Sequence, residues 1–232
     1  MALIIRIDVD RPYGRRPLAR HLLSRLSSDF YFPRVAGLGF LSELRTMLTW
    51  LNQANAQAHV FFRRCTLPSA LDLELLRAGR HEIGLHLENS RSFTTFDQER
   101  QILERHTGNK VRAVSKHGSG GAKYGYHHYA PYEAERYIEW AGQASFRLFL
   151  GNLQDPTLEP HKANGDLMVF PSAFWLEHPW RDTEKYTVEW LLDHGRRRDI
   201  VLLVHPENVL ADPGLVADFR RLISELESKT FS

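Results

Sequence analysis

Residues 3–10 read LIIRIDVD, an apolar and β-branched run that ends in two carboxylates. A short run of this kind is typical of a strand buried on both faces, as in a parallel sheet. Asp8 and Asp10 are two residues apart, so both side chains can point to the same face where the strand ends. Two close carboxylates repel each other unless a cation lies between them or one is protonated. The stretch therefore predicts a divalent-metal site or, alternatively, an aspartate that caps the next segment and is neutralised by Arg11.

Six further runs resemble this strand, and helical patterns lie between most of them. The other predicted strands are 59–63, 82–87, 111–115, 145–150, 167–171 and 200–204. The predicted helices are 40–55, 70–78, 95–106, 131–141, 184–194 and 209–226. Alternating strands and helices form parallel βαβ units, and about seven of them favour a barrel over a small open sheet. We therefore expect residues 1–232 to form a single α/β domain.

Two long segments interrupt this alternation. Residues 11–39 are rich in arginine, and residues 118–131 are rich in glycine, tyrosine and histidine. Both are expected to be loops that directly follow strands. Loops after the strands of a parallel barrel build its active face. The sequence therefore places both segments around a functional site.

The composition excludes several classes of protein. The 232 residues are 43% hydrophobic and carry 30 Lys+Arg against 28 Asp+Glu, which argues against a disordered chain and against a dedicated nucleic-acid binder. The single cysteine, Cys65, excludes an intramolecular disulfide and a cysteine-based zinc site. The sequence shows neither a signal-peptide pattern nor an apolar stretch of about 20 residues, so we expect a cytoplasmic protein without a membrane span.

Ligand-type side chains gather at the carboxyl ends of several predicted strands. His86 lies in the third strand, His117 follows the fourth, and His205 follows the seventh. Together with Asp8 and Asp10 they offer imidazole and carboxylate groups, which suit zinc and other first-row metals. A structural role is the simpler interpretation of each histidine alone, and the joint pattern favours a metal centre.

At this point the chain resembles the polysaccharide deacetylases, also called the NodB-homology or carbohydrate esterase family four enzymes. The resemblance rests on residues 7–10 (IDVD), 58–62 (AHVFF), 79–86 (GRHEIGLH), 169–172 (VFPS) and 202–207 (LLVHPE). These matches occur in the family's order and span nearly the whole chain. The resemblance implies an irregular (β/α) barrel, commonly of seven strands, and metal-dependent hydrolysis of an N- or O-acetyl group on a sugar.

The resemblance also implies roles for individual residues. Asp8 corresponds to the general base, and Asp10 corresponds to a metal ligand. His86 corresponds to the first histidine ligand, and His205 corresponds to the general acid. Zinc is the expected metal.

One position departs from the family's pattern. The second motif usually has another histidine four residues after the first, and Ser90 stands there in this sequence. His117, at a strand end, is the candidate replacement. Glu88 is a second candidate, because it shares a face with His86 if the strand continues.

Aromatic and basic residues in the loops are candidates for substrate binding. Tyr124 and Trp175 can stack on sugar rings, although packing of the loops onto the barrel is the alternative. Arg11 and its neighbouring arginines can meet phosphate groups of a nucleotide- or lipid-linked sugar. Lys116 begins a segment, 116–120, that we expect to hold the oxyanion.

The expected function is a deacetylase that acts on an acetylated sugar or sugar-linked precursor, in surface polysaccharide or O-antigen-type glycan synthesis. Two alternatives stay open. One is an inactive relative that only binds carbohydrate, and the other is a hydrolase of another C–N bond, such as a cyclic amide.

Overall fold

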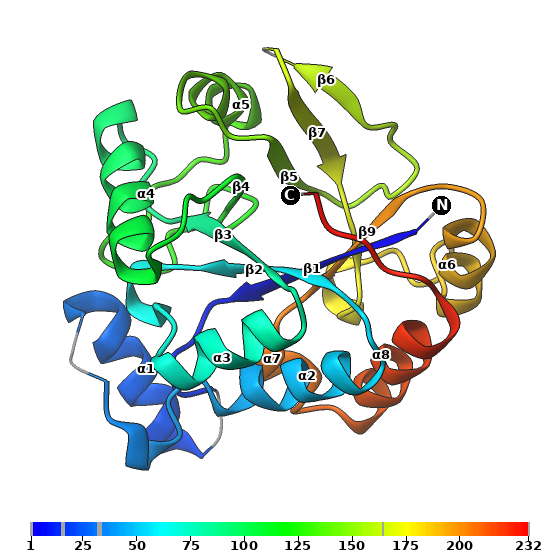
Figure 1. The fold of residues 1–232 in the computed structure, drawn as a ribbon, viewed down its shortest axis with the longest axis horizontal. Coiled ribbons are helices and arrows are strands. Elements are labelled where there is room, and N and C mark those ends of the chain that lie inside the picture. Colours follow the sequence, from blue (N-terminus) through cyan, green and yellow to red (C-terminus); the bar gives the residue numbers. More distant parts are fainter. Residues whose placement is uncertain (1, 15–16, 32–33, 164, 232) are drawn as a thin grey trace.

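One curled sheet forms the centre of the computed structural model, which describes residues 2–14, 17–31, 34–163 and 165–231 (Figure 1). Within these ranges its nine strands lie in the order β6-β7-β5-β4-β3-β2-β1-β9-β8. Their bounds are Leu3–Val9 (β1), Ala58–Phe62 (β2), Glu82–Leu87 (β3), Ala113–Lys116 (β4), Leu148–Leu153 (β5), His161–Ala163 (β6), Leu167–Ser172 (β7), Phe174–Trp175 (β8) and Ile200–Val204 (β9). Strand β6 is antiparallel to β7, and all other neighbouring pairs are parallel.

The segment that contains β7 and β8 connects the two sides of the curled sheet. Strand β7 pairs with β5, whereas β8 pairs with β9, and only Ala173 separates β7 from β8. One continuous segment therefore contacts strands that lie far apart in the sheet order. The result is an irregular barrel, which confirms the predicted α/β class and architecture.

Helices surround this sheet on the outside (Figure 1). Their bounds are Leu18–Phe30 (α1), Ser42–Gln53 (α2), Ala70–Ala78 (α3), Phe93–Thr107 (α4), Ala134–Gln143 (α5), Val188–Gly195 (α6), Pro206–Val209 (α7) and Pro213–Glu225 (α8). Short 3₁₀ turns cover Ala36–Leu38, Arg64–Thr66 and His178–Trp180. Among the described residues, no helix is both long and apolar enough to cross a bilayer.

Side chains alternate between two environments along each strand. On β1, Ile5 and Ile7 pack in the large core that includes the helices. Ile4 instead belongs to a smaller cluster inside the barrel, together with Phe61 on β2. A Cβ atom at Gly84 of β3 would lie 2.4 Å from the Phe61 ring, so this position needs glycine. The even-numbered residues of β1 thus face the barrel interior, and these include Arg6 and Asp8.

Several predicted boundaries differ from the structure. Residues 11–39 were expected to be a loop, and this prediction was wrong because helix α1 occupies 18–30. The predicted helix 209–226 starts four residues too early, because α7 ends at Val209 and α8 begins at Pro213. The predicted strand 145–150 is shifted to 148–153, because Ser145 has a positive φ of 60° and ends the preceding turn. Strands β6 and β8 were not predicted.

Candidate metal centre and active-site pocket

Three side chains meet at the carboxyl ends of β1, β3 and β4. Asp10 Oδ1 lies 3.0 Å from His86 Nε2 and 2.9 Å from His117 Nδ1, and the two histidine nitrogens are 3.3 Å apart. His86 and His117 are buried, and Asp10 is partly buried. Ser115 lies in β4, and His117 directly follows this strand. Because the two residues are two positions apart, both side chains point to the same face, toward the interior of the barrel.

The donor set fits a divalent metal. Asp10 Oδ1 is buried and lacks a hydrogen-bond partner among the described residues, although two imidazole nitrogens lie close to it. Tetrahedral ligands at about 2.0–2.1 Å from a zinc ion stand about 3.3 Å from one another, close to the spacing seen here. One carboxylate and two imidazoles could therefore supply three protein ligands, the number that catalytic zinc sites use.

Neighbouring groups orient these ligands. His86 Nδ1 lies 2.7 Å from Ser115 Oγ, and in the tautomer in which Nδ1–H donates to this hydroxyl, Nε2 keeps its lone pair for a metal. Burial and the nearby Arg63 charge lower the pKa of His117 to about 3, which keeps this imidazole in its neutral, metal-binding form. Arg63 also donates to the Asp10 carbonyl oxygen at 2.8 Å.

Asp8 lies beside this centre and is bound by Arg6 from the same strand. Arg6 Nε and Nη2 donate to the two Asp8 oxygens at 2.9 and 2.6 Å. Asp8 Oδ2 lies 3.6 Å from His86 Nε2, next to the three ligand atoms. Burial by itself raises the pKa of Asp8, but the Arg6 guanidinium and the neighbouring histidines outweigh it, and the pKa is lowered. Asp8 is therefore held as an oriented carboxylate.

His205 lies on the other side of Asp10 and has its own carboxylate partner. Its Nδ1 is 2.7 Å from Glu177 Oε1, which also accepts from the His205 backbone N–H at 2.9 Å. Its Nε2 is 3.7 Å from Asp10 Oδ2. Burial by itself lowers the pKa of His205, but Glu177 and then Asp10 and Asp8 raise it to about 10. His205 is therefore protonated at neutral pH.

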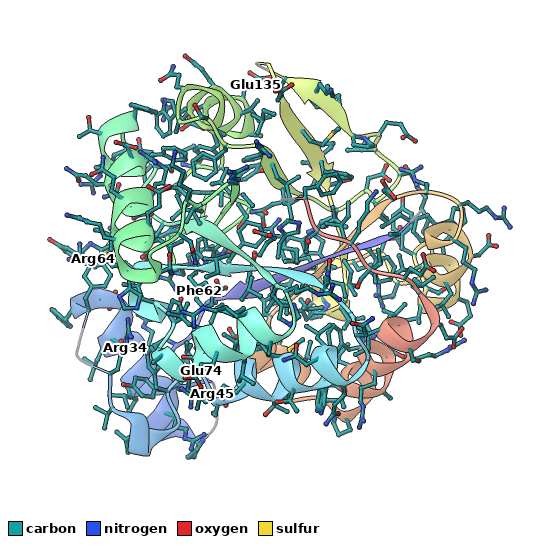
Figure 2. The ribbon with its side chains drawn as sticks, in the orientation of Figure 1. Arg34, Arg45, Phe62, Arg64, Glu74 and Glu135 are labelled. Carbon is teal, nitrogen blue, oxygen red and sulfur yellow. The ribbon has the colours of Figure 1, made fainter. Side chains whose placement is uncertain are left out.

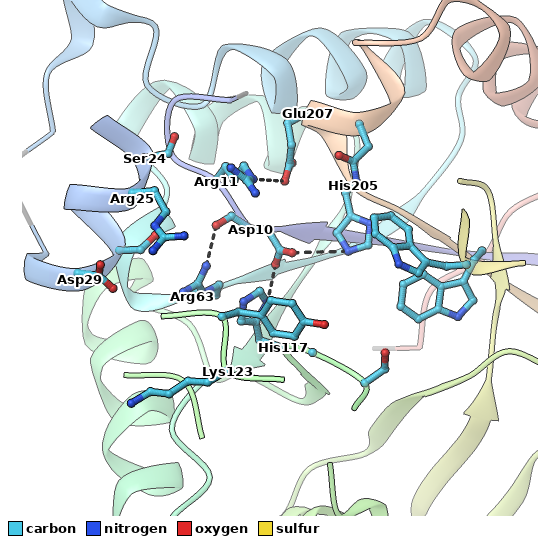
Figure 3. Close-up of a pocket in the computed structure, with 17 residues that line it drawn as sticks. Asp10, Arg11, Ser24, Arg25, Asp29, Arg63, His117, Lys123, His205 and Glu207 are labelled. Atoms are coloured by element: carbon cyan, nitrogen blue, oxygen red, sulfur yellow. Dashed lines mark hydrogen bonds and ion pairs between the residues drawn. The ribbon is translucent and has the colours of Figure 1, made fainter. Parts of the chain in front are cut away.

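A cavity of about 380 Å³ is lined by Asp10, His117 and His205, whereas Asp8 and His86 are not among its lining residues (Figure 3). Its wall includes Tyr124 and two tryptophans, Trp175 and Trp180, whose rings both lie 5.9 Å from the His205 ring. Arg11 also lines it and pairs with Glu207 at 3.7 Å. The cavity thus combines aromatic faces with charged groups beside the metal ligands.

The sequence-predicted residues differ in where the structure places them. Ser90 is buried and lies 3.2 Å from the Tyr137 hydroxyl, away from the three ligands. Glu88 forms an ion pair with Arg63, so this charge is already compensated. Lys116 is buried and donates to two backbone carbonyl oxygens, those of Glu88 and His117. It alternates with His117 along β4, so its side chain points away from the cavity and does not support the predicted substrate contact.

Sequence reasoning missed Arg6, Arg63 and Glu177. Arg6 stands two residues before Asp8, so period-two spacing could have placed both on one face of the strand. Arg63 directly follows β2, so its position at the end of a strand could have identified it. Glu177 has no comparable signal, because its approach to His205 depends on how the chain turns after β8.

Comparisons with known proteins bear on the fold. No family model matches the sequence, and no curated protein matches it. A solved structure from Parabacteroides distasonis, described as a candidate glycoside hydrolase/deacetylase, has a TM-score of 0.53 at 10% identity, over 96% of this chain and 66% of that one. A polysaccharide deacetylase from Bacillus cereus has a TM-score of 0.47 at 11% identity, over 99% and 92% of the chains. A CE4 family pseudoenzyme from Bacillus anthracis has a TM-score of 0.47 at 12% identity, over 100% and 69%.

These identities are too low to carry function from one protein to another, and the Parabacteroides similarity shows the fold alone. The resemblance to polysaccharide deacetylases is confirmed at that level: the chain has the fold that the motifs imply. What the site does must be argued from its own residues.

Proposed function

We propose that this protein is a metal-dependent hydrolase that removes an acetyl group from an N-acetylated, or O-acetylated, sugar. The observation that carries the proposal is the convergence of Asp10, His86 and His117 on one point, beside a cavity that Asp10 and His117 line. Asp8 and His205 flank that point from two sides. A divalent metal held there, zinc in our proposal, would polarise a carbonyl and make its bound water acidic at neutral pH.

Asp8 is placed to act as the general base. Both its oxygens accept hydrogen bonds from Arg6, so it remains ionised and cannot rotate. Oδ2 faces the ligand triangle at 3.6 Å from His86 Nε2, and it would receive the proton of the attacking water. Because Asp8 and Arg6 both lie inside the barrel, bulk water is excluded from this proton transfer.

His205 is placed to act as the general acid. Its Nδ1 is engaged by Glu177, so the proton on Nε2 is the one that can leave toward the cavity. An amine is a poor leaving group as an anion, and transfer of this proton to the amide nitrogen would allow the C–N bond to break. The two roles are thus assigned to two groups with opposite protonation states, which is typical of acid–base pairs.

The cavity wall supports a carbohydrate substrate. Tyr124, Trp175 and Trp180 offer ring faces to a sugar. Arg11 would meet a charged substituent, as in a sugar-linked precursor of a surface glycan.

Acetate release from acetylated sugars, set against ring opening of cyclic amides, tests this function. The zinc-loaded protein is incubated with N-acetylated sugars, O-acetylated sugars and cyclic amides. We expect acetate from the sugars, and Asp8→Asn and His205→Gln should lower kcat by about 10²–10⁴-fold with little change in KM. Asp182→Asn and His161→Gln, at exposed positions, are matched controls. Turnover of cyclic amides alone would favour the other hydrolase, and sugar binding without turnover would favour an inactive relative.

A further inference from the structure

Helix α1 carries four large apolar side chains on the outside of the molecule, whereas its Leu23 packs against the core. Leu18, Leu22, Leu26 and Phe30 follow one another at four-residue intervals and are 72%, 55%, 46% and 69% exposed. Residues at this spacing lie on one side of a helix. We call these four residues the α1 ridge. Ser24 of the same helix is buried instead.

Folding favours the opposite orientation of such a helix, with its apolar side chains buried. An amphipathic helix of a globular protein turns its apolar stripe toward the core. Here the inner side of α1 is held by polar contacts: Ser24 Oγ accepts from Tyr13 N–H and donates to the Gly14 carbonyl, both at 3.1 Å. A contiguous exposed apolar row of this kind marks a surface that binds something outside the domain.

The charge around the α1 ridge is positive. Among the described residues, Arg25 on α1 is exposed, and Arg20 on the same helix pairs with Glu43 at 4.0 Å. Asp29, the acidic residue of α1, accepts from the Tyr126 N–H at 2.8 Å. Arg34 and Arg64 are exposed on the same side of the molecule as α1 (Figure 2). Leu and Phe on one face with arginines beside them suit an anionic lipid surface. A second copy of this chain would instead bring like charges together.

We propose that the α1 ridge docks this protein onto an anionic lipid surface. Its leucines would enter the boundary of the acyl chains while the surrounding arginines meet headgroup phosphates. Arg25 and Asp29 belong to the same helix and line the cavity on the side opposite His205 (Figure 3). Docking would therefore bring the cavity entrance close to the lipid.

This position has a consequence for the substrate. If the proposed function holds, a sugar carried on a lipid anchor could reach the metal centre without leaving the surface. That consequence rests on the proposed function, whereas the docking itself does not.

Co-sedimentation with vesicles tests the docking. The full chain is mixed with vesicles of phosphatidylglycerol and phosphatidylcholine in equal parts, or of phosphatidylcholine alone, at low and high salt. We expect the wild type to sediment with the anionic vesicles and to be released by salt. Leu22→Gln/Leu26→Gln should reduce partitioning about tenfold or more. Leu153→Gln/Leu158→Gln changes two exposed leucines outside α1 and should sediment as the wild type does.

The outcomes separate docking from catalysis. All four replaced leucines are exposed, so circular dichroism should show unchanged folding, and turnover of a water-soluble acetylated sugar should be the same in every variant. A wild type that stays in the supernatant, or a Leu22→Gln/Leu26→Gln variant that sediments like the wild type, overturns the docking. A wild-type dimer that this variant converts to a monomer, with no sedimentation of either, would assign the ridge to a second copy and also overturn it. Loss of turnover with intact sedimentation would count only against the proposed function.

Discussion

Arg6 binds both carboxylate oxygens of Asp8 from two residues earlier on the same strand, at 2.9 and 2.6 Å. Both side chains point into the barrel, and both are almost completely buried. Two residues on the same face of one strand thus supply a carboxylate together with its counter-ion. The pair places an oriented, ionised group next to the proposed metal centre.

Arg6→Met should destabilise the protein more than Asp8→Asn does. Without Arg6, Asp8 is left as a buried charge without its donors, which costs about 3–5 kcal/mol. Without the Asp8 charge, Arg6 still donates to the carbonyls of Leu150 and Gly151 and to Asn152 Oδ1. The free energies of unfolding of both variants in urea measure the difference. Equal losses, or a larger loss for Asp8→Asn, would show that the pair is not organised in this way.

Glu177→Gln should shift the alkaline limb of the pH–kcat profile. The Glu177 carboxylate opposes the effect of burial and raises the pKa of His205 to about 10. The proton needed by the leaving group is therefore present below that pH and is lost as the pH rises through it. With the neutral amide, the limb should move down by more than about one pH unit. Glu184→Gln, at an exposed position, is the control, and an unmoved limb in Glu177→Gln would remove His205 from the acid role.

Lys116→Met should affect stability and leave substrate affinity unchanged. The Lys116 ammonium donates to the carbonyl oxygens of His117 and Glu88 at 2.6 and 3.3 Å and does not line the cavity. Loss of these bonds should lower the free energy of unfolding by about 1–3 kcal/mol. KM for an active substrate, measured at a temperature where the variant is folded, should stay within about twofold. A much larger KM would return Lys116 to the substrate site.

His59 should make the protein less stable in mild acid. Burial lowers the pKa of this histidine to about 4, while an unfolded chain takes up the proton near its ordinary value of about 6.5. The stability that depends on neutral His59 is therefore complete above pH 6.5 and is lost as the pH falls toward 4. The loss is at most about 1.4 kcal/mol for each pH unit. Urea unfolding of the wild type and of His59→Gln at pH 7 and pH 5 should show the steeper fall for the wild type, and parallel falls would contradict this.

The strands were predictable because their burial leaves a direct mark on the sequence. Stretches such as 3–9 and 200–204 are apolar and β-branched because strands of a parallel sheet are covered on both faces. The sequence of helix α1 shows no comparable signal of burial. Four of its apolar residues face outward, whereas Leu23 packs against the core, so the apolar stripe expected of a core-facing helix is absent.

The candidate site was predictable where it depends on alternation along one strand. Period-two spacing places Asp8 beside Asp10 on one face of β1, and the ends of β3 and β4 bring His86 and His117 to the same edge. Contacts such as that of His205 with Glu177 join segments that converge only in three dimensions. No local pattern in the sequence encodes such a contact.

Metal content of the untagged, purified protein tests the central claim most directly. The wild type is measured by elemental analysis, with and without prior addition of zinc, beside Asp10→Ala, His86→Ala, His117→Ala and the exposed control His161→Ala. We predict about one metal ion per chain in the wild type and in His161→Ala, because three protein ligands suffice for a catalytic site. The three ligand variants should have lost it. A wild type that holds no metal even after zinc is added, or a His117→Ala variant that keeps its full metal content, would contradict the site described above.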